Sequence, residues 1–139
     1  MLGLGDTFLV PKSSLEIEHL WIIITDRDPI THEAVCVNVT TLQVSSEKTV
    51  IVIAKEHPFV THDSVIRYAD AKKLDLRKVE AALDAQCTTF ICEQKEKCTP
   101  ALLKRIQDGL LQSRTVPKGI KEHCKQQWLG KKSAKSEIA

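Results

Sequence analysis

The sequence has no long hydrophobic run, no internal repeat and no large excess of charge of one sign, and each absence excludes a class of protein. No stretch approaches the roughly 18 consecutive apolar residues that a membrane span requires. The net charge is only +2 over 139 residues, which is too small for binding of nucleic acid through overall charge alone. We therefore expect residues 1–139 to form one soluble domain.

The start of the chain and its cysteines favour a cytoplasmic location. Residues 1–10 (MLGLGDTFLV) lack the basic region and the small-residue cleavage site of a secretory signal. The cysteines number five and are irregularly spaced, whereas a disulfide framework would more often have an even number. We expect a cytoplasmic protein that does not enter a membrane.

Several of these cysteines, together with a histidine, are candidates for a metal site: Cys87, Cys92, Cys98, His123 and Cys124. Their spacings differ from the short C-x2-C knuckle of most structural zinc sites. We therefore predict no metal and no cofactor, and we keep a metal-stapled nucleic-acid-binding domain as an alternative. Cys36 lies within a predicted strand and is expected in the core.

Two short segments rich in β-branched residues, 21–25 (WIIIT) and 34–40 (AVCVNVT), predict the pair of strands around which the fold is organised. The turn-forming segment 26–33 (DRDPITHE) joins them, so the pair is expected to be antiparallel. In such a pair the start of one strand lies beside the end of the other. We therefore expect His19 and Thr40 to lie within a few ångströms of each other, where an imidazole and a hydroxyl can act together in chemistry.

Three further strands are expected, at residues 7–10, 49–54 (TVIVIA) and 64–68 (SVIRY). The second of these is apolar enough to be buried on both faces or to close a barrel. Five short strands without intervening helices predict a small, strongly curved sheet or barrel. Residues 88–92 (TTFIC) are the candidate for one more strand.

Two helices are expected in the second half of the chain. Asp75 is a good N-cap for a helix over residues 76–86, and Thr99 followed by Pro100 is a clear start for another. Gly109 is expected to weaken the second helix locally.

The chain is expected to end in a basic tail. From residue 118 to residue 135 it carries six lysines against one glutamate, and such an end is usually solvated and partly disordered. The alternative for these lysines is contact with an RNA backbone. The predicted organisation is a barrel core with the first long helix (3–83), an additional strand and helix (84–116) and this tail (117–139).

The segments GDTFLVP, WIIIT, VCVNVTT and DSVIRYADAKKLD follow one another in an order and at spacings that resemble the MazF/PemK toxins. The likeness covers residues 3–83. The matching positions are Gly5 and Asp6 in the opening turn, Thr40 with Thr41 at the strand end, Asp63-Ser64-Val65, and Asp70 or Asp75 as the acidic residue before the helix.

The resemblance implies a mainly β fold with C-terminal helices, namely a small SH3-like β-barrel of the MazF/PemK type. It also implies a toxin of a type II toxin–antitoxin pair, acting as a sequence-preferring endoribonuclease on RNA. A homodimer and a cognate antitoxin, whose disordered tail fills the RNA groove, belong to the same expectation. The alternative is a non-catalytic SH3-like module that binds protein or nucleic acid, because one fold hosts many functions.

The chain departs from the family at one position. These toxins usually carry an arginine just before the second strand, where this sequence has His19, preceded by Glu18. Cleavage of RNA without a metal requires a deprotonated 2′-hydroxyl, a protonated 5′-oxygen and stabilisation of the charge on the phosphate. We assign His19 to proton transfer or phosphate binding, Thr40 to a hydrogen bond with a phosphate oxygen, and Glu18 to holding the imidazole ring.

A second polar group lies around the loop before residue 64. Loops over a rigid sheet concentrate binding residues, so Lys55, His57 and His62 are predicted RNA contacts, together with Thr41. Lys12 is another, because the related toxins cover RNA with the loop after the first strand. The alternative for these residues is a solvated surface.

Overall fold

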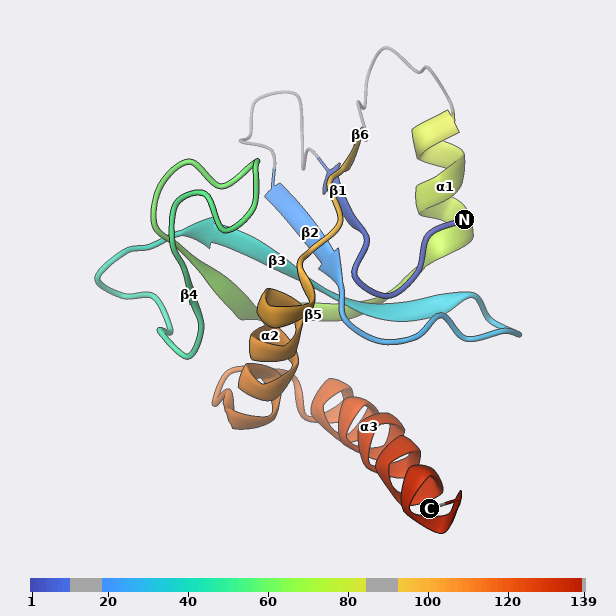
Figure 1. Ribbon diagram of the computed structural model, residues 1–139. Helices are drawn as coiled ribbons and strands as arrows, with labels where there is room; N and C mark the ends of the chain where they lie inside the picture. The colour runs from blue at the N-terminus through green and yellow to red at the C-terminus, as the bar shows by residue number, and fades with distance from the viewer. Residues whose placement is uncertain (11–18, 85–92, 139) are drawn as a thin grey trace.

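A computed structural model describes residues 1–10, 19–84 and 93–138, and its framework is one antiparallel sheet that curls into a half-barrel (Figure 1). The strands lie in the order β4-β5-β3-β2-β1-β6. Their bounds are β1 (Thr7–Val10), β2 (His19–Ile23), β3 (Glu33–Thr41), β4 (Ile51–Val52), β5 (Ser64–Asp75) and β6 (Glu93–Lys95). With three helices around this sheet in the described residues, the protein is mainly β, as expected.

The sequence predicted the central strands well and the later ones less well. β1, β2 and β3 form where β-branched residues are dense, and β2 pairs with β3 as an antiparallel hairpin. β4 is shorter than the predicted strand over 49–54, whereas β5 continues well beyond residue 68. The predicted strand over 88–92 lies outside the described residues.

Successive side chains along the strands point alternately into two separate hydrophobic cores. Leu20 and Ile22 point to the larger core, which α2 (Pro100–Gln112) covers with Leu102, Ile106 and Leu110. Trp21 and Ile23 point to the smaller core on the other face, which α1 (Leu76–Asp84) covers. This alternation follows from the two-residue repeat of a strand. Cys36 belongs to the smaller core, as the sequence predicted.

Both predicted helix starts are confirmed. Asp75 Oδ1 accepts a hydrogen bond from the backbone N–H of Arg77 (3.0 Å) at the start of α1. Thr99 Oγ1 accepts one from the N–H of Leu102 (3.3 Å), and Pro100 occupies the first position of α2. These side chains satisfy N–H groups that have no partner inside the helix.

Gly109 lets α2 approach the sheet closely. A Cβ atom at this position would overlap with the side chains of Tyr68 and Val50. The hydroxyl of Tyr68 donates a hydrogen bond to the carbonyl of Ile106 (2.7 Å), which fixes the same contact from the strand. The glycine is therefore a requirement of helix–sheet contact as well as a weak point of the helix.

The basic end of the chain is helical, where the sequence predicted a solvated, partly disordered tail. Residues Lys118–Ile138 form helix α3. Cys124 is fully buried in the larger core, and Ile120 and Trp128 pack against it. These three positions are four residues apart and so share one helix face, which the surrounding lysines obscured in the sequence. None of the helices in the described part of the chain is long and apolar enough to cross a bilayer.

A histidine joins the two ends of the curled sheet. His57, in the loop after β4, lies with Nε2 2.6 Å from the carbonyl oxygen of Glu96, which follows β6. The hydroxyl of Thr7 on β1 donates to the same carbonyl (2.8 Å). Because Nδ1 accepts from the N–H of Phe59 (3.0 Å), Nε2 carries the proton and is the donor to Glu96.

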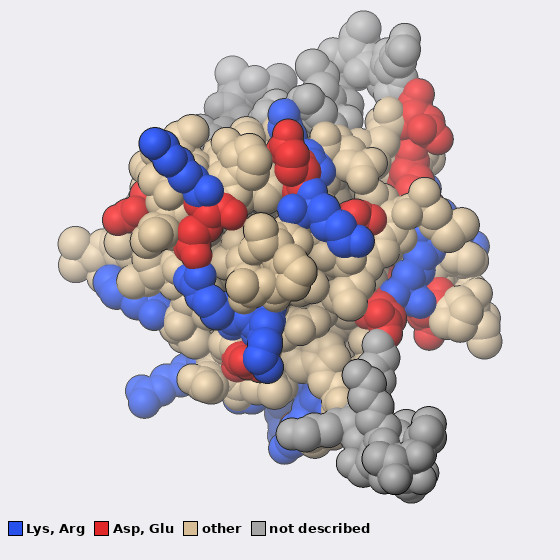
Figure 2. All heavy atoms as spheres, viewed as in Figure 1, with Lys and Arg blue, Asp and Glu red and all other residues tan. Residues whose placement is uncertain are grey.

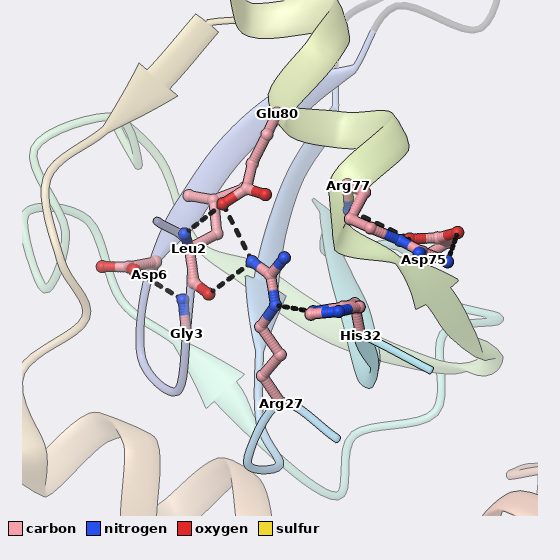
Figure 3. Close-up of polar contacts among 8 residues, drawn as sticks. All are labelled: Leu2, Gly3, Asp6, Arg27, His32, Asp75, Arg77 and Glu80. Atoms are coloured by element: carbon pink, nitrogen blue, oxygen red, sulfur yellow. Dashed lines mark hydrogen bonds and ion pairs between the residues drawn. The ribbon is translucent and has the colours of Figure 1, made fainter. Parts of the chain in front are cut away.

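A network around Arg27 ties the start of the chain to the β2–β3 loop and to α1 (Figure 3). Arg27 Nη1 donates to Glu80 Oε2 (2.9 Å) and to the carbonyl of Leu2 (3.2 Å). Its Nε donates to His32 Nδ1 (3.2 Å), and the N–H of Leu2 donates to Glu80 Oε2 (2.7 Å). The Arg27–Glu80 pair lowers the pKa of the Glu80 carboxyl.

Candidate functional site: a polar groove at the end of β3

His19 and Thr40 lie on the same face of the sheet, at the end of the central hairpin. The register of β2 and β3 pairs Leu20 with Val39 and Trp21 with Asn38. One further step sets His19 opposite Thr40, and residues opposite each other in an antiparallel pair point to the same face. Both side chains are half-buried, whereas the adjacent Leu20 and Val39 face the larger core.

The ring of His19 is oriented by the backbone. Its Nδ1 lies 3.4 Å from the carbonyl oxygen of Val39, a long contact in which the nitrogen must be the donor because a carbonyl only accepts. In a neutral ring with this contact, the lone pair lies on Nε2, the arrangement that a general base requires. Glu18 and Lys12 lie outside the described residues.

A second threonine–histidine pair stands at the same end of β3. Thr41 Oγ1 and His62 Nε2 are 3.0 Å apart, and both residues are exposed. Thr41 is in register with Ser64, so the loop that carries His62 is anchored at the start of β5. The structure thus brings His62 to Thr41, whose side chain points to the opposite face of the sheet from that of Thr40.

Two other predicted contacts lie elsewhere. His57 is buried, and both ring nitrogens are used in joining β1, β6 and the loop after β4. Lys55 is exposed in that loop, where it has a positive φ of 76° and its N–H donates to the carbonyl of Val60. Neither residue lines the groove described next.

A groove of about 280 Å³ runs beside β5 at this end of the sheet. Thr40, Thr41 and Arg67 contribute to its lining, and so do four residues of the loop after β3, namely Gln43, Ser45, Ser46 and Glu47. Glu47 in that loop accepts hydrogen bonds from Ser113 Oγ (2.8 Å) and the Arg114 N–H (2.9 Å). Burial alone would raise the pKa of Glu47, but its hydrogen bonds together lower it.

Arg67 was not predicted from the sequence, yet it is the basic side chain in the lining of the groove. It is in register with Asn38, two residues from the pair formed by Thr40 and Val65. Residues in this diagonal relation lie about 7–8 Å apart, within reach of a long side chain. No local sequence pattern identifies Arg67 as a site residue, because its position near Thr40 depends on the pairing of β3 with β5.

The guanidinium of Arg67 is held by a carboxylate on the same strand, that of Asp70. Its Nε lies 3.2 Å from Asp70 Oδ2, and the same oxygen accepts a hydrogen bond from Asn38 Nδ2 (3.1 Å). β5 carries extra residues here, since Arg67 pairs with Asn38 but Lys72 already pairs with Cys36. Such bulges redirect side chains and are frequent beside functional sites.

Asn38 is buried within this arrangement. It is 1% exposed, and its Oδ1 has no hydrogen-bond partner among the residues that the structure describes. An unsatisfied buried carbonyl costs about 1–3 kcal/mol, so a polar residue at this position needs a reason other than stability. Beside it, Lys72 Nζ lies 5.1 Å from the centre of the Trp21 ring and adds a second positive charge to this face.

The face of the molecule in Figure 2 is not uniformly basic. Figure 2 shows lysine and arginine side chains interspersed with acidic ones over the face in view. An anionic ligand would therefore be bound by particular side chains rather than by a general positive field.

The cysteines in the described ranges are core residues. Burial raises the pKa of the Cys98 thiol to about 11 and that of Cys124 to about 12, so both stay protonated at neutral pH. Across residues 1–10, 19–84 and 93–138, no group of three or more His, Cys, Asp or Glu side chains is placed to hold a metal ion. Cys87 and Cys92 lie outside the described residues.

The chain matches no protein-family model, and no curated protein is significantly similar to it. Of the side chains at this end of the sheet, Thr40 and Arg67 line the groove, whereas His19 and His62 are not among its lining residues.

Proposed function

We propose that this protein is a metal-independent endoribonuclease similar to the MazF/PemK toxins, with a small SH3-like barrel of that type. The observation that carries the proposal is the presence of His19 and Thr40 on one accessible face at the end of the β2–β3 hairpin. The curled antiparallel sheet supports the fold part of the proposal. The polar groove beside Thr40 supports the binding part.

In the proposed reaction, His19 Nε2 takes the proton from a ribose 2′-hydroxyl, and the resulting oxygen attacks the adjacent phosphorus. The bond from O2′ to phosphorus forms, and the bond from phosphorus to O5′ breaks. Thr40 Oγ1 donates a hydrogen bond to a non-bridging phosphate oxygen as charge builds up on it. The leaving O5′ takes its proton from solvent, because His62 contacts Thr41, which faces away from His19 and Thr40.

The proposal includes partners as well as a substrate. The proposed protein partners are a second copy of the chain and an antitoxin. Two further residue roles belong to the proposal: Glu18 holds the His19 ring, and Lys12 contacts RNA. Light scattering of the purified protein and co-purification with the product of a neighbouring gene test these two assemblies. A monomer that co-purifies with no small acidic protein would remove them from the proposal.

The decisive test compares wild type with His19→Ala in bacterial growth and in cleavage of single-stranded RNA in the presence of EDTA. We expect wild type to arrest growth and cleave RNA, and loss of the base to lower kcat by about 10²–10⁴-fold. RNA with 2′-deoxy substitution should not be cleaved, because it lacks the attacking hydroxyl.

The matched control is His123→Ala, which removes a half-buried histidine on α3 away from the groove. It should cleave like wild type. If wild type is harmless and cleaves no RNA, the non-catalytic binding module is the better description. If His19→Ala cleaves like wild type, another residue is the base.

A further inference from the structure

The proposed cleavage beside Thr40 requires a positive charge, and His19, which is not among the residues that line the groove, does not supply it while it acts as a base. The pentacoordinate phosphate gains negative charge, and a fixed cation close to it is among the strongest ways to stabilise that charge. The position just before β2, where an arginine would serve, is occupied by His19. Another element must therefore provide the cation.

Arg67 reaches the required place from β5. It lies on the same face as Thr40, diagonal to it across the β3–β5 pair, and both residues line the same groove. Its side chain is 59% exposed, so a ligand in the groove can contact it. A phosphate between the two residues would meet a hydroxyl on one side and a guanidinium on the other.

The guanidinium is pre-oriented for this contact. Asp70 engages Nε, and neither Nη nitrogen has a hydrogen bond with a residue in the part of the chain that the structure describes. The two Nη groups form the fork that binds two phosphate oxygens at once. Asn38, which is buried, fixes Asp70 in turn.

We propose that Arg67 is the phosphate-binding cation of this groove, positioned by Asp70 and Asn38, and that it takes the part of the arginine missing before β2. The inference rests on the proposed function and names its ligand class, the phosphodiester of single-stranded RNA. The arginine comes from a different strand, so its placement depends on the β3–β5 register and on the bulge in β5.

The test measures binding and cleavage separately for wild type, Arg67→Gln and Arg67→Lys. The binding probe is a short fluorescent 2′-O-methyl RNA pool of randomised sequence, which cannot be cleaved. For Arg67→Gln we expect about tenfold weaker binding. The slope of log Kobs against log salt should fall by about 0.7, as for one lost phosphate contact. Cleavage should fall by about 10²-fold. Arg67→Lys should keep the salt slope and lose most of the cleavage, because it keeps the charge without the fork.

The matched control is Arg77→Gln. Arg77 has the same exposure (58%) and is paired with a nearby carboxylate, Asp75, but it lies on α1 and does not line the groove. It should bind and cleave like wild type. Thermal melting of each variant confirms that it is folded.

The possible outcomes separate the two proposals. If wild type cleaves and Arg67→Gln cleaves and binds equally well, the role of Arg67 is wrong and the nuclease stands. If wild type binds the pool through Arg67 but cleaves no RNA, the phosphate site stands and the nuclease is wrong. If wild type neither binds nor cleaves, both are overturned.

Discussion

At the scale of single residues, the groove is an example of an exposed charge controlled by a buried amide. Asn38 cannot touch a ligand, because its side chain is covered. It acts through Asp70, whose Oδ2 is shared between Asn38 Nδ2 and Arg67 Nε. This chain of contacts makes Asp70 a positioning residue, whose loss should change the geometry of the cation but not its charge.

Asp70→Asn should therefore separate binding from turnover. Arg67 remains charged, so the salt slope of binding to the 2′-O-methyl RNA pool should not change. Its guanidinium is less firmly oriented, and we expect kcat to fall about tenfold. Asp108→Asn, at an exposed carboxylate on α2 paired with Lys104, is the control and should cleave normally. Normal turnover in Asp70→Asn would contradict the positioning role.

At the scale of elements, α2 packs closely against the sheet at Gly109, which has no side chain. Gly109→Ala should destabilise the fold by about 1–3 kcal/mol, because the new methyl group overlaps with Tyr68 and Val50. Gly130→Ala, the same substitution in α3, has open space around it and should stabilise by up to about 1 kcal/mol. Urea unfolding of the two variants checks the opposite signs. Equal effects would mean that α2 can move away at little cost.

At the scale of the whole molecule, the Arg27 network connects the N-terminal residues, the β2–β3 loop and α1 (Figure 3). The pKa of Glu80 is lowered, first by its hydrogen bond with Arg27. A carboxyl group with a depressed folded-state pKa contributes stability that is present above its unfolded pKa and is lost as pH falls through the folded value.

The fold should therefore lose stability as pH falls below the ordinary glutamate pKa of about 4.3. Glu80→Gln should be less stable than wild type at neutral pH, and the difference in melting temperature should shrink as the pH falls. Glu122→Gln removes the same charge from an exposed position on α3 and reports the effect of net charge alone. A Glu80→Gln difference that stays constant from neutral to acid pH would contradict the assignment.

Local signals predicted the first half of the fold and the helix starts. The β-branched runs specify β1, β2 and β3, and the capping residues Asp75 and Thr99 specify where α1 and α2 begin. The length of β5 was missed because its second half is held by pairing with β3 across a bulge, which no local pattern encodes. α3 was missed because lysines separate its few apolar residues.

The same distinction applies to the site. His19 and Thr40 could be found from the sequence, because a hairpin fixes which ends of its strands meet. Arg67 could not, because its place beside Thr40 depends on a non-local register. The sequence predicted His57 as an RNA contact in a loop. Only its contacts with Thr7 and Glu96 in the folded structure reveal that it joins the two ends of the sheet.

The order of strands has a consequence for synthesis on the ribosome. β1 lies between β2 and β6, so one of its neighbours is translated early and the other only after β5 and α1. Until Glu93–Lys95 emerges, β1 exposes an unpaired backbone edge, the kind of surface through which nascent polypeptides associate. A chain that ended prematurely after α1 would contain every strand that lines the groove. It would lack β6, and the unpaired edge of β1 would be prone to aggregation.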